Sequence, residues 1–267
     1  MKRIGFIGAG NMATAIISGI ARAGMEAELF ACDHNEDKVA ALAQYGVKPQ
    51  PSAKELASAV DVLFLAVKPQ NFAEVLAEIR GSVRPETVIV SIAAGITAQY
   101  IVDSLGIPPQ AAKVVLAMPN TPLLLGCGAT ALSKGAGVPD DEFDFVRRIF
   151  DCAGITAVIP ADRMNEIIPI NGSSPAFIYQ YAKLFIDYGV SVGFSEQTCL
   201  SLFAQTLIGS AKMMTESGRS IEELIRMVSS KGGTTIAGLA ALEENNLPQA
   251  VRAACEKSVA RAYELSK

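Results

Sequence analysis

A glycine-rich turn close to the start of the chain constrains its fold more than any other feature. Gly8, Gly10 and Ala13 have the spacing G-x-G-x-x-A, which follows an apolar run at residues 3–7 and opens an amphipathic helix expected at residues 13–23. In such a unit the first glycine permits the tight turn, the second lets a pyrophosphate approach the backbone, and the small third residue keeps helix and strand close. The turn therefore predicts a dinucleotide-binding domain of the Rossmann type rather than a purely structural turn.

The first part of the chain alternates between expected strands and expected helices. Because strands that alternate with helices form parallel sheets covered on both faces, we predict an α/β fold with a mostly parallel sheet. The expected strands are residues 3–7, 28–32, 62–67, 87–92, 113–117, 128–133 and 155–159, and the expected helices are residues 13–23, 37–45, 72–79 and 141–150.

From about residue 161 onward the pattern is helical only. Ser220 and Glu223 have the spacing of a capping box, which marks the start of a short helix. We expect helices at residues 175–188, 195–218 and 220–227, with two more after Gly232-Gly233. The predicted domains are therefore a Rossmann domain at residues 1–161 and an all-helical C-terminal domain at residues 162–267.

Composition excludes several classes of function. A net charge of −4 gives no electrostatic reason to bind nucleic acid. No apolar run reaches the roughly 18 residues of a membrane span, and Met1-Lys2-Arg3 leads directly into a strand rather than a signal peptide. The five cysteines are scattered without the spacing of metal ligands or a redox pair. We therefore expect a cytoplasmic protein with reduced thiols, no metal site and no membrane partner.

Several chain breaks fall where a parallel sheet places its ligands, at the carboxyl ends of strands. Asp33 ends the second expected strand, 20 residues after Ala13, where a carboxylate accepts a hydrogen bond from a ribose 2′-hydroxyl. The alternatives are a solvated loop acid at Asp33, a plain surface lysine at Lys68 and a plain strand breaker at Pro119. The predicted cofactor-binding residues are Ile7, Gly8, Ala9, Gly10, Asn11, Met12, Asp33, His34, Ala66, Val67, Lys68, Pro69, Ala93, Met118, Pro119 and Asn120.

A second pair of glycines opens a helix in the helical part of the chain. Gly232 and Gly233 free the backbone, and Thr234 and Thr235 then begin an apolar helix. Unpaired N–H groups at a helix start form a receptor for a small anion such as a carboxylate. The alternative interpretation is an ordinary helix–helix turn with a threonine cap.

These motifs together resemble a known family, the pyrroline-5-carboxylate reductases, over the whole chain. The segments that carry the resemblance are Gly8-Ala9-Gly10-Asn11-Met12, Val67-Lys68-Pro69-Gln70, Ser91-Ile92-Ala93-Ala94-Gly95, Met118-Pro119-Asn120-Thr121-Pro122, Gly172-Ser173-Ser174-Pro175-Ala176 and Gly232-Gly233-Thr234-Thr235. The resemblance implies reduction of 1-pyrroline-5-carboxylate to L-proline by NADPH or NADH, the last step of proline biosynthesis. It also implies a helical domain that intertwines with a partner into a dimer, often assembled further into decamers.

Within that resemblance we assign roles to residues of the helical part. The substrate carboxylate is expected at the backbone N–H groups of Gly233 and Thr234, and the hydroxyl of Thr235, the catalytic residue, at the ring nitrogen. Met118, Pro119 and Asn120 are expected to wall the nicotinamide. The full set of predicted substrate-binding residues is Ser174, Pro175, Ser230, Gly232, Gly233, Thr234 and Thr235.

The chain also departs from the family pattern. Members of the family often have Arg at the position of Leu116 and Pro at the position of Lys231. They often have Gly at the position of Ser174 and Tyr at the position of Phe177. Asp33 and His34 stand where NADPH-preferring members often have Asn or Ser and then Arg. Because an acid repels a 2′-phosphate, we expect NADH to be used at least as well as NADPH.

Three alternatives to this function remain open from the sequence. A 3-hydroxyacid dehydrogenase of the same two-domain plan would use a lysine on the long helix, for which Lys183 is the candidate. A non-catalytic dinucleotide sensor would need no receptor for a small acid. A sister reductase would act on a related cyclic imino acid. His34 is the only histidine and is expected at the adenosine end, which disfavours dehydrogenases that deprotonate an alcohol with histidine.

Overall fold

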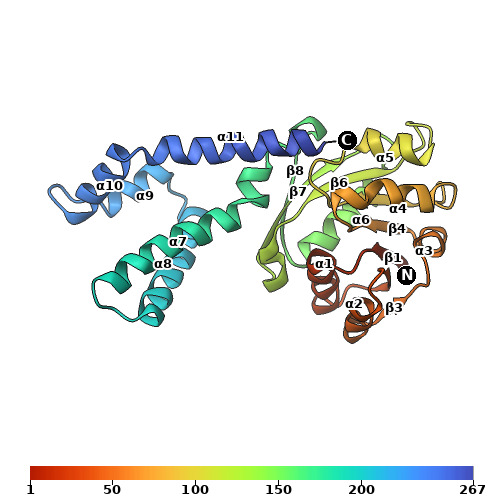
Figure 1. Ribbon diagram of the computed structural model, residues 1–267, viewed down its shortest axis with the longest axis horizontal. Helices are drawn as coiled ribbons and strands as arrows, with labels where there is room; N and C mark the ends of the chain where they lie inside the picture. The colour runs from red at the N-terminus through yellow and green to blue at the C-terminus, as the bar shows by residue number, and fades with distance from the viewer. Residues whose placement is uncertain (267) are drawn as a thin grey trace. The chain divides into compact units, whose positions relative to one another are not determined.

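A computed structural model describes residues 1–266 of the chain, which divide into two units by their contacts (Figure 1). The first unit contains Met1–Pro175 together with the chain from Lys257 onward, and the second contains Ala176–Glu256. These units differ from the expected division at 161/162, because residues 162–175 and the end of the last helix pack on the sheet. Met164, Ile168 and Ala262 are all buried in the core of the first unit.

The first unit is built on one eight-stranded sheet. Its strand order is β3-β2-β1-β4-β5-β6-β7-β8, and every neighbouring pair is parallel except β6 with β7. The strands are β1 (Lys2–Ile7), β2 (Ala27–Cys32), β3 (Val47–Pro49), β4 (Val62–Leu65), β5 (Val88–Ser91), β6 (Val114–Met118), β7 (Gly128–Lys134) and β8 (Gly154–Val158). The prediction of a mostly parallel α/β sheet is confirmed.

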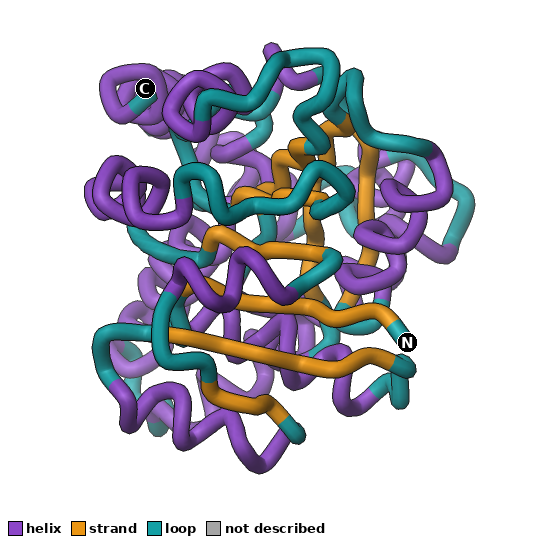
Figure 2. Tube along the Cα trace, turned by 90° about the vertical axis from the view of Figure 1, so that its right-hand side faces the viewer, coloured by secondary structure: helices purple, strands orange, loops and turns teal. Residues whose placement is uncertain are grey.

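Helices cover both faces of this sheet, and in Figure 2 they lie in front of and behind its strands. The α-helices of the first unit are α1 (Asn11–Arg22), α2 (Glu36–Ala41), α3 (Ala53–Ala59), α4 (Phe72–Ile79), α5 (Ala98–Leu105) and α6 (Asp140–Asp151). Short helical turns are η1 (Leu42–Tyr45), η2 (Pro69–Asn71), η3 (Thr121–Leu125), η4 (Ala161–Arg163) and the wider turn η5 (Ile168–Gly172).

Each face of the sheet has its own apolar layer, because successive side chains of a strand point to opposite faces. On one face Phe6 stacks on Phe64 with ring centroids 4.6 Å apart, and Phe64 meets the edge of Phe150 at 5.9 Å. On the other face, Leu63 and Leu65 pack in the cluster formed with α3, α4 and α5. The two layers fix the sheet and thereby the position of its carboxyl edge.

Three elements of the first unit are not evident in the sequence pattern. Strand β3 has only three residues, which is too short to show a period. Helices α3 and α5 are preceded by the N-cap residues Ser52 and Thr97, whose side chains accept hydrogen bonds from the N–H groups of Glu55 and Tyr100. Such caps stabilise short helices by satisfying free N–H groups.

The second unit is helical throughout, as expected. Its helices are α7 (Ser174–Ser191), which begins in the first unit, α8 (Glu196–Glu216), α9 (Ile221–Met227), α10 (Thr234–Glu244) and α11 (Leu247–Leu265), which ends in the first unit. The expected capping box is present, since Ser220 and Glu223 each bond the other's backbone N–H at the start of α9. Across residues 1–266, no helix has the length and apolar character needed to cross a bilayer.

Candidate active site

The glycine turn joins the carboxyl end of β1 to the start of α1. Gly8 has a φ of +101°, and a side chain there would place its Cβ 2.7 Å from the carbonyl oxygen of Ala66, so only glycine fits. Its N–H donates to the carbonyl of Cys32 at 2.8 Å. The turn is thus held between β2 and β4, in the middle of the sheet.

The start of α1 offers an open receptor for a phosphate. Gly10 is the N-cap of α1 and provides no side-chain hydrogen bond, so the first N–H groups of the helix, from Asn11 onward, have no intrahelical partner. A Cβ added at Gly10 would meet no atom within 4 Å. Free N–H groups, the positive end of the helix dipole and open space above a glycine fit a pyrophosphate. The residues present therefore fit a dinucleotide.

Asp33 follows β2 and ties the glycine turn to that strand. Its Oδ2 accepts a hydrogen bond from the N–H of Ala9 at 2.8 Å, and its Oδ1 accepts one from the N–H of Asn35 at 2.9 Å. Burial acts to raise the pKa of this carboxyl, but the two N–H donors and the charge of Lys38 outweigh it, so the pKa of Asp33 is lowered. The side chain is therefore an ionised carboxylate that still has free lone pairs for a ribose hydroxyl.

A pocket with an acidic lining opens beside Asp33. Glu36 and Glu78 line it as well, and none of the described residues around it is lysine or arginine. Burial and the neighbouring Glu78 and Asp33 raise the pKa of the Cys32 thiol to about 12. The exposed side chain of His34 lies at the same pocket. This end of the cofactor site is thus negatively charged.

The other predicted cofactor residues lie along the same edge of the sheet. The N–H of Ala66 donates to the carbonyl of Ile7 at 2.8 Å, which brings the ends of β4 and β1 together. Ala93 follows β5, and Met118 ends β6. Both pack in the apolar layer that contains Leu63 and Leu65. Lys68 is exposed, and Pro69 begins the turn η2. The sheet therefore brings the predicted cofactor residues to one edge.

The side chain of Asn120 is engaged within the protein. Its Nδ2 donates to the carbonyl of Asn171 at 3.1 Å, and its Oδ1 accepts from the N–H of Ala129 at 2.9 Å. Asn171, which the sequence analysis did not single out, donates from Nδ2 to the carbonyl of Met118 at 2.6 Å. Both asparagines are buried. They fix the backbone after β6, the segment that is predicted to wall the nicotinamide.

The Gly232–Thr235 turn opens α10 as the sequence predicts. Gly232 has a φ of +75°, and Gly233 is an N-cap that provides no side-chain hydrogen bond. The N–H of Gly233 donates to the carbonyl of Ser230 at 2.9 Å, so it is not a free donor in this structure. The unpaired donors of the turn begin at Thr234 and Thr235, one residue later than expected.

Ser174 and Pro175, also predicted to bind substrate, lie at the start of α7 in the first unit. The Oγ of Ser174 donates to the carbonyl of Ile170 at 2.8 Å, and Pro175 is buried. The predicted substrate residues from Ser230 to Thr235 belong to the second unit. The predicted substrate residues are therefore divided between the two units.

Lys183, the candidate base of a hydroxyacid dehydrogenase, is a surface residue of α7. Its Nζ forms an ion pair with Asp187 one helical turn later, at 2.5 Å. The side chain is 64% exposed. This arrangement is typical of a solvated helix face.

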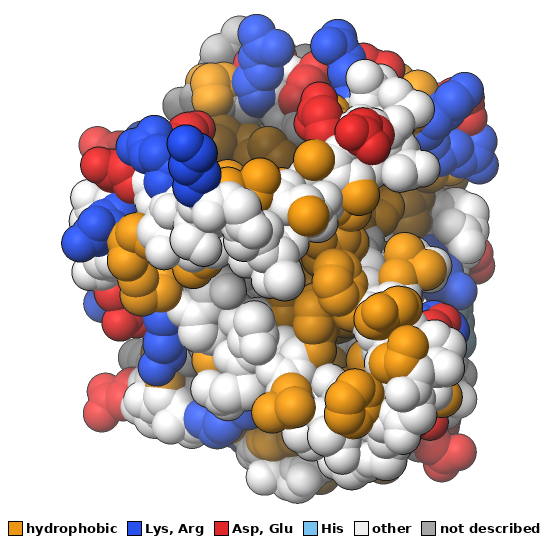
Figure 3. Space-filling view, turned by 90° about the vertical axis from the view of Figure 1, so that its left-hand side faces the viewer, with side chains coloured by type: hydrophobic (Ala, Val, Ile, Leu, Met, Phe, Trp, Pro, Cys, Tyr) orange, Lys and Arg blue, Asp and Glu red, His pale blue; other side chains and the backbone are white. Residues whose placement is uncertain are grey.

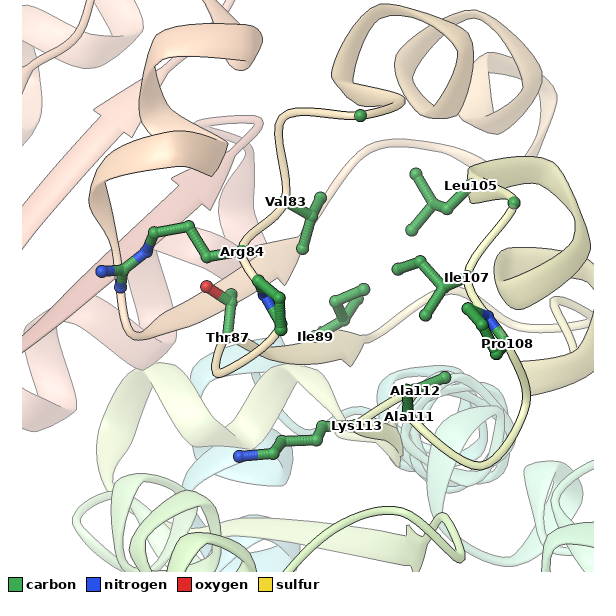
Figure 4. Close-up of a pocket in the computed structure, with 13 residues that line it drawn as sticks. Val83, Arg84, Thr87, Ile89, Leu105, Ile107, Pro108, Ala111, Ala112 and Lys113 are labelled. Carbon is green, nitrogen blue, oxygen red and sulfur yellow. The ribbon is translucent and has the colours of Figure 1, made fainter.

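A second pocket lies at the opposite edge of the sheet (Figure 4). Val83, Leu105 and Ile107 form its apolar wall, near the amino ends of β5 and β6. Arg84 and Lys113 extend away from that wall in Figure 4, and they pair with Asp61 and Glu142. The pocket is therefore separate from the candidate site and presents no free charge to a ligand. Among the described residues, no group of three or more metal-ligating side chains is found.

Comparison with known proteins gives the class and then the family. The sheet order, the open glycine turn and the acidic pocket beside Asp33 are typical of nicotinamide-dependent oxidoreductases, and here the second unit is helical. Residues 3–95 match the family model described as NADP oxidoreductase, coenzyme F420-dependent, and residues 161–265 match the model described as pyrroline-5-carboxylate reductase dimerisation.

Full-length relatives support the same family. The chain is 37% identical to the pyrroline-5-carboxylate reductase of Escherichia coli, over 100% of this chain and 99% of that protein. It is similar to the pyrroline-5-carboxylate reductase structure from Coxiella burnetii, with a TM-score of 0.90, 31% identity and coverage of 100% and 99%. It is also similar to the Plasmodium falciparum pyrroline carboxylate reductase structure with NADP bound, with a TM-score of 0.88, 28% identity and coverage of 100% and 98%. The chain belongs to the pyrroline-5-carboxylate reductase family.

Proposed function

We propose that this protein reduces the C=N bond of 1-pyrroline-5-carboxylate to give L-proline, with NADPH or NADH as hydride donor. The observation that carries the proposal is that this chain contains two helices, α1 and α10, whose first N–H groups receive no hydrogen bond from an N-cap side chain. One of them, at Gly10, fits a pyrophosphate, and the other, at Gly233, fits a small carboxylate. The full-length similarity to named reductases supports the same reaction.

In this proposal the helical unit holds the substrate. The N–H groups of Thr234 and Thr235 receive its carboxylate, while Ser230 and Gly232 shape the turn. Thr235 donates a hydrogen bond from its hydroxyl to the ring nitrogen as that nitrogen becomes an amine. The turn therefore orients the imine carbon and satisfies the developing amine without a histidine.

The cofactor supplies the hydride when it is bound. The chain's own residues position it: the turn at Gly8 and Gly10 holds the pyrophosphate, and the backbone of Met118 and Pro119 walls the nicotinamide. Asn120 and Asn171 act by fixing that backbone. Such positioning accounts for a large part of catalysis when the reacting groups need little activation.

One assay separates this activity from the alternatives. Oxidation of NAD(P)H is followed with pyrroline-5-carboxylate and without substrate, and formation of NAD(P)H from NAD(P)+ is followed with a β-hydroxyacid. We expect turnover with the imino acid alone. Turnover of the hydroxyacid would favour the dehydrogenase, and cofactor binding without turnover would favour a sensor. A kcat/KM that is larger for a six-membered cyclic imino acid than for pyrroline-5-carboxylate would identify the protein as a sister reductase.

We also propose that two copies associate through the helical unit. Figure 3 shows hydrophobic side chains spread over the face of this unit. Side chains such as Tyr188 (69% exposed) and Leu202 (67%) lie open in a single chain. Extended apolar surface of this kind usually marks an interface. The dimerisation model matched over residues 161–265 supports this, and assembly of such dimers into a decamer is a further proposal.

Light scattering tests the association. We expect a mass of at least twice 28.1 kDa at micromolar concentration. Leu202→Asp should lower that mass, whereas Leu125→Asp, at a residue that is 83% exposed in the first unit, should leave it unchanged. A wild-type mass near 28 kDa would contradict the proposal.

The acidic ribose pocket supports use of NADH at least as well as NADPH. Asp33 is ionised, and Glu36 and Glu78 add negative charge with no arginine in the lining. Bringing a 2′-phosphate within a few ångströms of such a carboxylate costs on the order of 1–3 kcal/mol. A 2′-hydroxyl instead donates to the carboxylate.

The ratio of kcat/KM for the two cofactors tests this preference. In Asp33→Asn/His34→Arg, the ratio should shift towards NADPH. A wild-type preference for NADPH of more than about tenfold, roughly 1.4 kcal/mol, would contradict the role of Asp33.

We propose a cytoplasmic location as well, consistent with five cysteines that are all free.

A further inference from the structure

The end of the last helix packs against the loop that follows β5. Gly95 in this loop has a φ of +77° and is buried. A Cβ built on Gly95 would lie 3.0 Å from the carbonyl oxygen of Ala262 and 3.2 Å from the Cβ of Leu265. The positive φ and this close approach together favour glycine at position 95.

This contact is part of the apolar layer beneath the candidate cofactor site. Ala262 is 4% exposed and belongs to the same cluster as Ile96 and Met118, and Ala93 packs against that cluster. Ala93 and Met118 are both among the predicted cofactor residues, and Met118 is one of those proposed to wall the nicotinamide. The last turn of α11 thus packs against the loop that carries Ala93, in the same apolar layer as Met118.

Polar contacts hold that last turn in place. The hydroxyl of Tyr263 donates to Oε1 of Glu166 at 2.5 Å. The Nδ2 of Asn165 donates to Oγ of Ser266 at 3.1 Å. Glu166 and Asn165 both lie in the segment between β8 and α7. These hydrogen bonds therefore hold the end of α11 against that segment of the first unit. Some 170 residues separate Gly95 from this turn in the sequence.

We propose that the last turn of α11, residues 262–265, together with Ser266 after it, is a positioning element for the cofactor. It backs the loop at residues 93–96, and the nicotinamide side of the site takes its binding shape only while this turn is docked. The inference rests on the proposed cofactor site but not on the identity of the imino acid. Because the nicotinamide is common to NADH and NADPH, a defect here weakens both cofactors by the same factor.

Titration of NADH and of NADPH fluorescence into the full-length protein measures the two Kd values. Ala262→Leu overfills the apolar cluster in which the Ala262 side chain is buried, and we expect both Kd values to rise by about 5- to 100-fold, the range that overpacking at one site permits. The NADH-to-NADPH ratio should stay constant, and the KM for cofactor should change more than kcat. Arg261→Ala, on the same helical turn but exposed and paired only with Glu264, is the matched control and should change neither Kd.

Tyr263→Phe provides a second test that leaves the core intact. Removing its hydroxyl should increase hydrogen exchange at residues 92–97 and weaken both cofactors, without a comparable change in the distant strand β2. Folded Ala262→Leu and Tyr263→Phe proteins with wild-type Kd values would overturn the proposal. A change in the cofactor ratio would also overturn it, because the effect would then lie at the adenosine end. Failure to reduce pyrroline-5-carboxylate would contradict the proposed activity while leaving these titrations interpretable.

Discussion

The two units of this chain remove apolar side chains from water in different ways. In the first unit, Phe6, Phe64 and Phe150 are buried within the chain itself. In the second unit, none of the described residues from Ala176 to Glu256 is buried. The first unit therefore closes its own core, whereas the helical unit leaves its apolar surface for another molecule.

The difference between the units also appears in their helices. In α4 the apolar residues Phe72, Val75, Leu76 and Ile79 lie on one face and are buried. In α10, apolar residues are distributed around the helix and none is buried. A helix that is apolar all round is stable in water only when it is covered. Stability of the first unit should thus be a property of one chain, and stability of the second a property of the assembly.

The largest expected effect is at Phe64, in the middle of the sheet. Phe64→Ala removes a fully buried ring that contacts Phe6 and Phe150, and should lower the free energy of unfolding by about 3–5 kcal/mol. Urea unfolding measures the loss, which should be the same at low and high protein concentration. A loss that depends on protein concentration would contradict the comparison between the units, because the stability of the first unit would then also depend on assembly.

The next effect is catalytic and belongs to the helical unit. Thr235→Val keeps the size of the side chain but removes the hydroxyl proposed to bond the ring nitrogen. We expect kcat/KM for pyrroline-5-carboxylate to fall by about 5- to 150-fold, on the order of 1–3 kcal/mol. The Kd for NADH should remain near the wild-type value. An unchanged kcat/KM would remove Thr235 from the mechanism.

A smaller effect, with a defined pH dependence, is expected at Asp61 in the first unit. Burial acts to raise the pKa of Asp61, but hydrogen bonds from Arg3 and Arg84 outweigh it and hold the pKa well below its ordinary range. Because the folded-state pKa is lowered, this carboxylate stabilises the fold above an unfolded-state pKa of about 3.9. That contribution is lost as the pH falls through the folded-state value.

Asp61→Asn should accordingly reduce stability by about 1–3 kcal/mol at pH 7. The difference between wild type and variant should be constant down to about pH 4 and shrink below it. Urea unfolding at several pH values provides the measurement. A difference that grows as the pH falls would mean that Asp61 is not held as an anion.

The sequence predicts the fold where the signal is local and misses features that depend on distant contacts. The glycine turn, the main strands and the capping box at Ser220 are encoded in a few neighbouring residues, and the structure confirms them. Asn171 is a single polar residue in an apolar stretch, and its role depends on Met118, 53 residues away. No periodicity carries that information.

The candidate site shows the same division. The sequence motifs locate the predicted cofactor residues at the carboxyl edge of the sheet, because each follows a strand of a parallel sheet. The engagement of the Gly233 N–H by Ser230 is a detail of turn geometry, and it moves the expected donors by one residue. The approach of Ala262 to Gly95 follows only from the folded chain. Sequence motifs therefore locate the site, while packing decides which groups are free.

The smallest effect is expected at Lys183, and it tests how the polar surface of the helical unit is used. Its ion pair with Asp187 is exposed and spans one helical turn, a type of pair worth only about 0.3–0.5 kcal/mol. Lys183→Ala should therefore change the free energy of unfolding by less than about 0.5 kcal/mol and leave kcat unchanged. Urea unfolding and the NAD(P)H assay measure the two quantities, with Lys212→Ala on α8 as a matched surface lysine. If kcat falls by orders of magnitude in Lys183→Ala alone, the lysine is a catalytic base. The polar face of α7, rather than the turn at Gly233, would then carry the chemistry of the helical unit.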